Sequence, residues 1–245
     1  MVDTWGPDFH QKVLFCAGSA GTLFAIGIAL GKTPEYLDAL YTKIAEKTKT
    51  YGTFYYGSLF MEEALREIVS DPMSYKLLEG RLAFSTTSFF ANHRWHISWR
   101  DNEDLIECAK ASCHIPLYCQ KNSGVKGTLV IDGAYSFAGI DLPHGDETLY
   151  IGIDPHAEIT RPFTNNQMLY AHVGKEYEEI VHSGYEAFMA WDGRMNQKVG
   201  RRQPNYQALY ILWFLKVVEL ISDFFVWIFE VLVTLFKSLV ARALC

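Results

Sequence analysis

The sequence lacks an excess of positive charge, and it is poor in cysteine. Its 22 lysine and arginine residues are outnumbered by 28 aspartate and glutamate residues, which gives a formal net charge of −6 at pH 7. A nucleic-acid-binding protein usually has a basic stripe, so no nucleic-acid partner is expected. The five cysteines are odd in number and scattered along the chain. They do not form the framework of a small secreted protein, and an intracellular location is expected.

Signal-peptide and metal-site patterns are missing as well. Residues 1–11 lack the basic and long apolar segments of a secretory signal, and we expect them to form a leader before the first strand. Cys113 and Cys119 are spaced too loosely for a zinc knuckle. His93 and His96 would lie on opposite faces of a strand. We therefore expect no metal ion and no other cofactor.

Hydrophobic residues, in contrast, make up 49% of the 245 residues. That is enough for one well-cored domain with an appendage. Apolar runs of strand length alternate with stretches of helical periodicity, which predicts an α/β layer architecture. Helices are predicted over residues 33–49, 58–69, 102–115 and 176–190, and strands over residues 81–87, 93–100, 127–131 and 149–153.

Residues 12–31 form the most informative stretch. They predict a short buried strand, a turn of small residues and an apolar helix that Gly31 ends. Gly18 and Gly21 allow a sharp turn, and Ser19 lies at its tip, before a helix N-terminus that favours developing negative charge. This arrangement fits a nucleophile elbow. A serine that only caps a helix fits the same residues, so this stretch alone leaves both interpretations open.

A serine nucleophile needs a base, and Asp132 is the better candidate. None of the eight histidines has the spacing of a known triad. Asp132 ends a predicted buried strand, and Gly133 lets the chain turn away, as at the active sites of open α/β sheets. Asp-Gly is also a common hairpin turn, so the motif alone is weak.

Taken together, three motifs resemble those of the patatin-like phospholipase family. They are Ala17-Gly18-Ser19-Ala20-Gly21, then Ala111-Ser112-Cys113-His114-Ile115-Pro116, then Asp132-Gly133-Ala134. That family pairs a Gly-x-Ser-x-Gly elbow with an aspartate in an Asp-Gly-Gly or Asp-Gly-Ala motif. The resemblance extends through residues 82–99 and 182–185 and covers roughly residues 12–192. It implies a three-layer α/β/α patatin-like domain with a central mixed sheet.

The resemblance also implies an activity, that of a lipid acyl hydrolase of the phospholipase or acylglycerol lipase type. Ser19 would attack an ester carbonyl of a glycerolipid, Asp132 would take its proton, and water would release the fatty acid from the acyl-enzyme. The supporting residues would be Ala17, Gly18, Ala20 and Gly21 in the elbow, and Gly133 and Ala134 in the base motif.

Two departures from the family pattern favour an alternative, a catalytically impaired patatin-like module that binds lipid or a partner at a membrane. Ala17 replaces the first glycine of the elbow. The family's Gly-rich loop, whose N–H groups form the oxyanion hole, precedes the elbow, yet Gly6 is the sole glycine before Gly18. Loss of one oxyanion donor typically lowers the rate by about 100- to 1000-fold.

The C-terminal segment has a different composition. A basic linker is predicted over residues 193–206, followed by a hydrophobic helix over residues 207–241 whose charged residues lie on one narrow stripe. No stretch reaches the roughly 18 uncharged residues expected of a spanning helix. Three interpretations stay open: a helix in or on a membrane, a spanning helix whose stripe faces a partner, and a helix buried in a homo-oligomer. A purely structural membrane or oligomerisation protein is therefore a third functional class.

Overall fold

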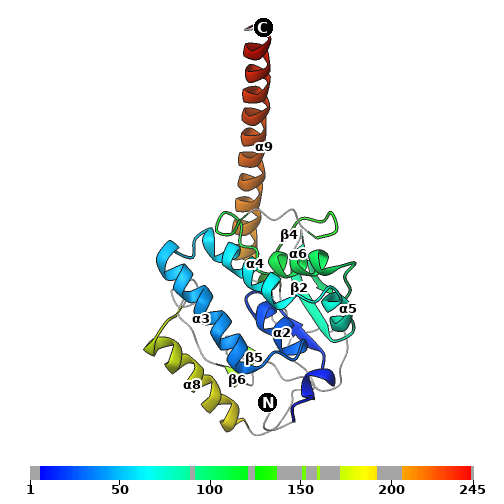
Figure 1. The fold of residues 1–245 in the computed structure, drawn as a ribbon, viewed down its shortest axis with the longest axis vertical. Coiled ribbons are helices and arrows are strands. Elements are labelled where there is room, and N and C mark those ends of the chain that lie inside the picture. Colours follow the sequence, from blue (N-terminus) through cyan, green and yellow to red (C-terminus); the bar gives the residue numbers. More distant parts are fainter. Residues whose placement is uncertain are drawn as a thin grey trace.

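The computed structural model describes residues 6–88, 92–120, 125–136, 151–152, 159–160, 172–191 and 206–243. Its main body is a sheet with helices on one face, from which one long helix projects (Figure 1). The predicted basic linker lies outside the described residues, apart from residue 206. The division into a leader and a domain over residues 12–192 stays a prediction.

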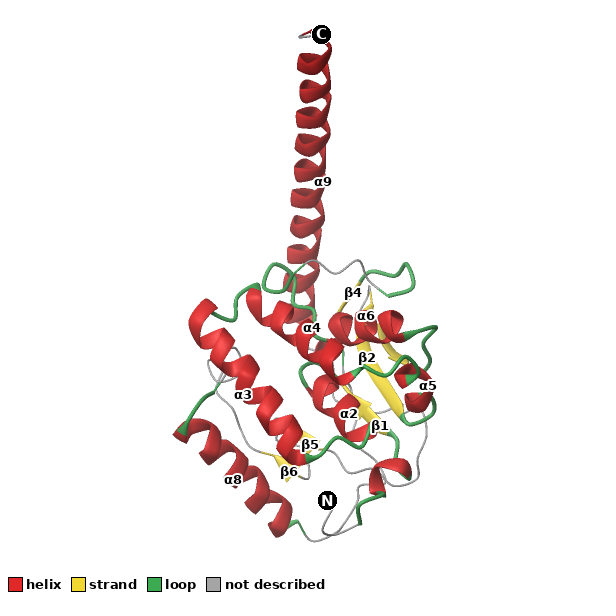
Figure 2. Ribbon diagram, in the orientation of Figure 1, coloured by secondary structure: helices red, strands yellow, loops and turns green. Residues whose placement is uncertain are grey.

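The sheet is organised on its central strand, β2 (Leu82–Ser88). β3 (Asn92–His96) pairs antiparallel with one edge of β2. Two strands share the other edge: β1 (Phe15–Ala17) pairs parallel with residues 82–84, and β4 (Val130–Asp132) pairs antiparallel with residues 86–88. β1 and β4 therefore run toward each other and end on either side of Ser85 (Figure 2).

Helices α2 (Gly21–Ala29), α4 (Tyr56–Ile68) and α6 (Asn102–Ser112) pack together on one face of this sheet, and α3 (Pro34–Tyr51) packs against α4 outside them. The core between helices and sheet contains large side chains with no exposed surface, among them Ile26, Leu65, Leu82, Phe84 and Leu105. This burial of large apolar side chains is the main contribution that holds the layers together.

Local sequence signals explain where the helices begin and end. Thr33 caps α3 by accepting a hydrogen bond from the backbone N–H of Tyr36, and Asp101 caps α6 through the N–H of Asp104. Gly31 has a φ of +72° directly after α2, a conformation that glycine adopts at little cost. The predicted end of this helix is confirmed.

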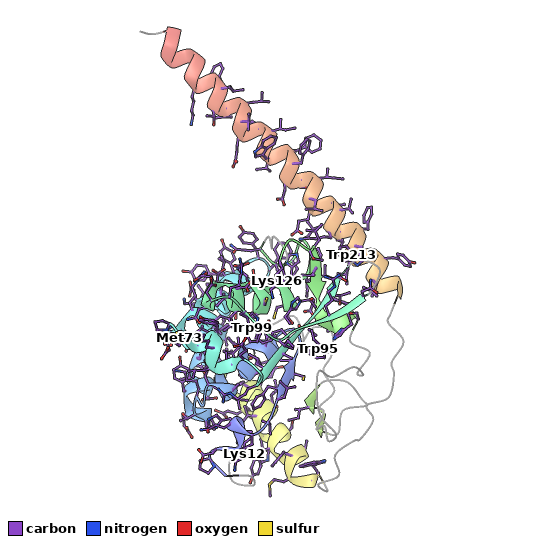
Figure 3. The ribbon with its side chains drawn as sticks, turned by 90° about the vertical axis from the view of Figure 1, so that its right-hand side faces the viewer. Lys12, Met73, Trp95, Trp99, Lys126 and Trp213 are labelled. Carbon is purple, nitrogen blue, oxygen red and sulfur yellow. The ribbon has the colours of Figure 1, made fainter. Side chains whose placement is uncertain are left out.

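The opposite face of the sheet is covered, among the described residues, by the base of α9 (Tyr206–Ala243). Side chains alternate across a strand, so Val130 faces the helical layer while Ile131 faces away from it. Ile131 packs against Leu209 and Leu212 of α9. Beyond its base, α9 projects away from the body, as seen past the labelled Trp213 (Figure 3). Of the three expected layers, the structure thus describes the sheet and one helical layer in full.

Several element bounds differ from the predictions. The strand predicted over 93–100 ends at His96, and Trp99 is instead buried in the core beside Phe84. The strand predicted over 127–131 is β4, which begins three residues later and ends one residue later than predicted. The remaining elements are η1 (Phe9–Gln11), α5 (Ser74–Leu78), η3 (Gly133–Tyr135), β5 (Ile151–Gly152), β6 (Ile159–Thr160) and α8 (Lys175–Ala190).

The C-terminal segment, for which the sequence pattern allows one long helix or two in line, forms one continuous helix, α9. Within the described part of the chain, no helix combines the length and the apolar character needed to cross a membrane.

The close approach of Gly133 to β2 yields a stability prediction. A Cβ at Gly133 would lie 2.3 Å from the backbone oxygen of Ser85, so Gly133→Ala should lower the free energy of unfolding by at least about 3 kcal/mol. A Cβ at Gly184, in the middle of α8, meets nothing within 4 Å. Gly184→Ala should raise the stability by up to about 1 kcal/mol, because alanine is the better helix former. Urea unfolding of both variants tests this, and equal effects at the two sites would contradict it.

Candidate active site

Ser19 lies on a strained turn between β1 and α2. Its φ of +54° places a residue other than glycine in the left-handed region, as at the serine of a nucleophile elbow. Its backbone N–H donates to the carbonyl oxygen and to Oγ of Ser112, at 3.1 and 3.2 Å. The residue that caps α2 is Ala20, without a side-chain hydrogen bond. The hydroxyl of Ser19 is thus not a helix cap.

That hydroxyl donates instead to Asp132, with 2.6 Å between Oγ and Oδ2. Asp132 is the last residue of β4, and its carboxylate is held from the other side because Oδ1 accepts the N–H of Ala134 at 2.8 Å. Its backbone N–H donates to the carbonyl of His114 at 2.9 Å, and its own carbonyl accepts the hydroxyl of Thr87 at 2.8 Å. Four hydrogen bonds thus fix the aspartate. The two residues that the sequence singled out lie side by side.

Ser85 on β2 sets the distance between the two strand ends. A Cβ at Gly18 would lie 2.6 Å from Oγ of Ser85, and one at Gly133 would lie 2.2 Å from the same atom. Both turns therefore pass so close to Ser85 that only glycine fits without displacement. The glycines of the elbow and of the base motif permit the approach of Ser19 to Asp132.

Burial changes the acidity of the aspartate. Desolvation raises the pKa of Asp132 from 3.8 to about 6, even though the hydrogen bonds from Ser19 and from the N–H of Ala134 lower it. A carboxylate with a pKa near neutrality is a better proton acceptor than an exposed one and is still ionised at pH 7. Asp132 therefore has the protonation behaviour of a general base.

One backbone donor beside Ser19 is available for an oxyanion. The N–H of Ala20, the residue after the serine, makes no hydrogen bond within the part of the chain that the structure describes. It lies at the N-terminal end of α2, where the helix dipole favours negative charge.

Sequence reasoning missed a second polar group next to the pair. His114 belongs to the quoted motif of residues 111–116, but the sequence assigned it no role; it is buried and contacts Lys216 and Glu219 of α9. The charged stripe of α9 was visible in the sequence, but its partner on the domain was not. Ser85, Ser112 and Thr87 were likewise not identified as residues that hold the site together.

Comparison with curated proteins finds a distant relative. The chain is 30% identical over 128 residues to the omega-hydroxyceramide transacylase of Mus musculus. The matched stretch is 50% of this chain and 21% of that protein. No protein-family model matches the chain. No solved structure matches it either.

The raised pKa of Asp132 predicts a pH-dependent stability. Because the pKa is about 6 in the folded chain against 3.8 as a reference, the folded state binds its proton more tightly, and stability falls as the pH rises from about 4 to about 6. Asp132→Asn removes the free-energy cost of ionising a buried carboxylate. At pH 8 the variant should be more stable than the wild type by up to about 3 kcal/mol, with a much smaller difference at pH 4.5. Urea unfolding at the two pH values measures this, and a pH-independent difference would contradict it.

Proposed function

We propose that this protein is a lipid acyl hydrolase in which Ser19 is the nucleophile and Asp132 the general base. The observation that supports this most strongly is the 2.6 Å hydrogen bond from the hydroxyl of a strained, turn-held serine to a buried carboxylate. The resemblance of the surrounding motifs to the patatin-like phospholipase family supports the same chemistry. Neither a histidine nor a metal ion is needed for it.

The proposed reaction has two steps. Oγ of Ser19 attacks the ester carbonyl while its proton moves to Oδ2 of Asp132, and the N–H of Ala20 donates to the developing oxyanion. The tetrahedral intermediate collapses, and the leaving alcohol takes the proton from Asp132. Water then attacks the acyl-enzyme and gives its proton to Asp132, and the fatty acid departs as the proton returns to Ser19.

A second candidate is acyl transfer to an alcohol. The curated relative is, by its name, a transacylase of omega-hydroxyceramide. Transacylation and hydrolysis share the acyl-enzyme and differ only in whether an alcohol or water attacks it. The same Ser19–Asp132 pair serves either reaction. We propose a glycerolipid ester as the acyl donor, because the elbow and base motifs resemble those of phospholipases.

We further propose that the protein works at a membrane surface inside the cell, through α9. The part of α9 beyond the domain exposes large apolar side chains over most of its circumference, among them Phe225, Trp227, Phe229 and Phe236. The polar residues in this part of α9 continue the charged stripe that the sequence shows along the helix. A helix of this kind is suited to lie within the interface of a lipid surface. Pairing of two copies along the stripe is the competing arrangement.

A second apolar surface supports the same proposal. The end of α3, the start of α4 and the segment between them expose four aromatic side chains, which we call the aromatic loop: Tyr51, Phe54, Tyr55 and Tyr56. It lies at the end of the domain from which α9 rises (Figure 1). Aromatic residues, above all Tyr and Trp, favour the boundary between head groups and acyl chains. The aromatic loop and α9 could therefore contact one lipid surface together.

The activity is tested with a fluorophosphonate probe, which reacts with activated serines. Wild-type protein should be labelled on Ser19, and Ser19→Ala should not be labelled. Asp132→Asn should be labelled about 100-fold more slowly or worse, because general-base catalysis contributes that much. Only the ionised form of Asp132 can accept the proton of Ser19. The labelling rate of the wild type should therefore rise with pH through about 6 and then level off. Folded wild-type protein that is labelled no faster than Ser19→Ala would instead support the catalytically impaired module.

The lipid-facing surface is tested by vesicle flotation of the full chain. Phe54→Asp combined with Tyr55→Asn should weaken binding to anionic phospholipid vesicles by about ten-fold, through lost apolar contact and added negative charge. Asparagine suits position 55, because Tyr55 has a φ of +67°. The matched control is Leu77→Asp with Tyr185→Asn, at exposed positions on α5 and α8. Equal binding of the two double variants would contradict the role of the aromatic loop.

A further inference from the structure

A buried polar cluster joins α9 to the domain. His114, Lys216 and Glu219 are 1%, 2% and 7% exposed. The ammonium of Lys216 lies 3.0 Å from Nε2 of His114 and also donates to Oε2 of Glu219. Nε2 of His114 also lies 3.4 Å from the same oxygen of Glu219, so each of the three side chains contacts the other two. We call this group the docking cluster.

The docking cluster is connected to both members of the candidate site through backbone hydrogen bonds of residues 112–114. The carbonyl of His114 accepts the backbone N–H of Asp132 at 2.9 Å. Two residues earlier, Ser112 accepts the backbone N–H of Ser19. The segment from Ser112 to His114 therefore holds the backbones of the serine and the aspartate at once, and the side chain at its end is held by α9.

A second contact from α9 reaches the same strand end. Leu209 and Leu212 pack on Ile131, the neighbour of Asp132, together with Trp213, which is partly buried. α9 thus contacts the base motif through an apolar patch on β4 and through the docking cluster on His114. Both contacts come from the first four turns of the helix, before it leaves the domain (Figure 3).

A buried ion pair contributes little net stability to the packing of a helix on a domain. Taking an ammonium and a carboxylate out of water costs free energy that their attraction only partly returns, and apolar residues often stabilise such a site better. What a buried ion pair with a hydrogen-bonded third partner does provide is a defined geometry, since each group must meet its partners at fixed distances and angles. Such a cluster suits a site where position matters more than stability.

From this geometry we infer that Lys216 and Glu219 are positioning residues, which act through His114 to hold the carboxylate of Asp132 in line with the hydroxyl of Ser19. The inference rests on the proposed function of that pair. It makes α9 a part of the active site as well as a lipid-facing helix. Lys216 and Glu219 touch neither the serine nor the substrate.

The chain supplies matched controls on the same stripe of the same helix. Lys237 and Glu230 lie at heptad positions that continue from Lys216, but they are exposed on the projecting part. Lys216→Met and Lys237→Met remove the same charge from α9, and Glu219→Gln and Glu230→Gln do likewise. A change in lipid binding or net charge would affect both members of each pair, whereas loss of positioning would affect only the buried member.

The experiment measures, on full-length protein, the rate of fluorophosphonate labelling together with kcat and KM for a soluble chromogenic ester. Lys216→Met and Glu219→Gln should lower kcat and the labelling rate by about ten- to a hundred-fold, with KM little changed, since small misplacements of catalytic groups cost this much. Lys237→Met and Glu230→Gln should react like the wild type. The exchange Lys216→Glu with Glu219→Lys should recover part of the rate, because it restores a buried pair beside His114.

Two results would overturn the inference. One is a folded Lys216→Met or Glu219→Gln protein, shown by its thermal unfolding curve to be native at the assay temperature, that is labelled at the wild-type rate. The other result applies if these single variants unfold. It is a folded Lys216→Glu with Glu219→Lys protein that is labelled no faster than either single variant. Failure of the wild type itself to be labelled would refute the proposed function, so the two failures are distinguishable.

Discussion

The hydrogen bond between Ser19 and Asp132 joins two residues that are 113 positions apart in the chain. It exists because β1 and β4 run toward each other along one edge of β2 and stop on either side of Ser85. The two glycines that follow these strands let both turns approach β2 more closely than any side chain would allow. The strand pairing, the close glycine contacts and the burial of the aspartate all serve to bring one hydroxyl and one carboxylate together.

The same burial has an energetic consequence. A carboxylate removed from water has a raised pKa, and its ionisation at neutral pH costs folding free energy. The protein offsets this cost locally, with hydrogen bonds from Ser19 and Ala134, and through the packing of its core. Strain at Ser19 and a destabilised carboxylate at Asp132 are two departures from the most stable arrangement, and both fall at the candidate site. This concentration of unfavourable terms is typical of functional sites.

Much of this could be predicted from the sequence. The small residues around Ser19 and the Asp132-Gly133 pair identified the two residues that meet, and the cap at Thr33 marks a helix start that the periodicity also indicates. The contribution of α9 to the site could not be predicted. The spacing of Lys216 and Glu219 indicated only a polar stripe, because a stripe that faces solvent and one that faces a buried histidine have the same sequence pattern. The end of β3 at His96 was also missed, since alternation continues through Trp99 although the backbone no longer pairs.

The central claim is that Ser19 forms a covalent acyl-enzyme with the help of Asp132. The most direct measurement is the mass of the protein and of its peptides after rapid acid quenching during turnover of a long-chain acyl ester. An added mass equal to the acyl group is expected on the peptide that contains Ser19, formed above about pH 6 and absent from Ser19→Ala. An acyl group on a different residue, or turnover of the ester with no acylated peptide in folded wild-type protein, would contradict it.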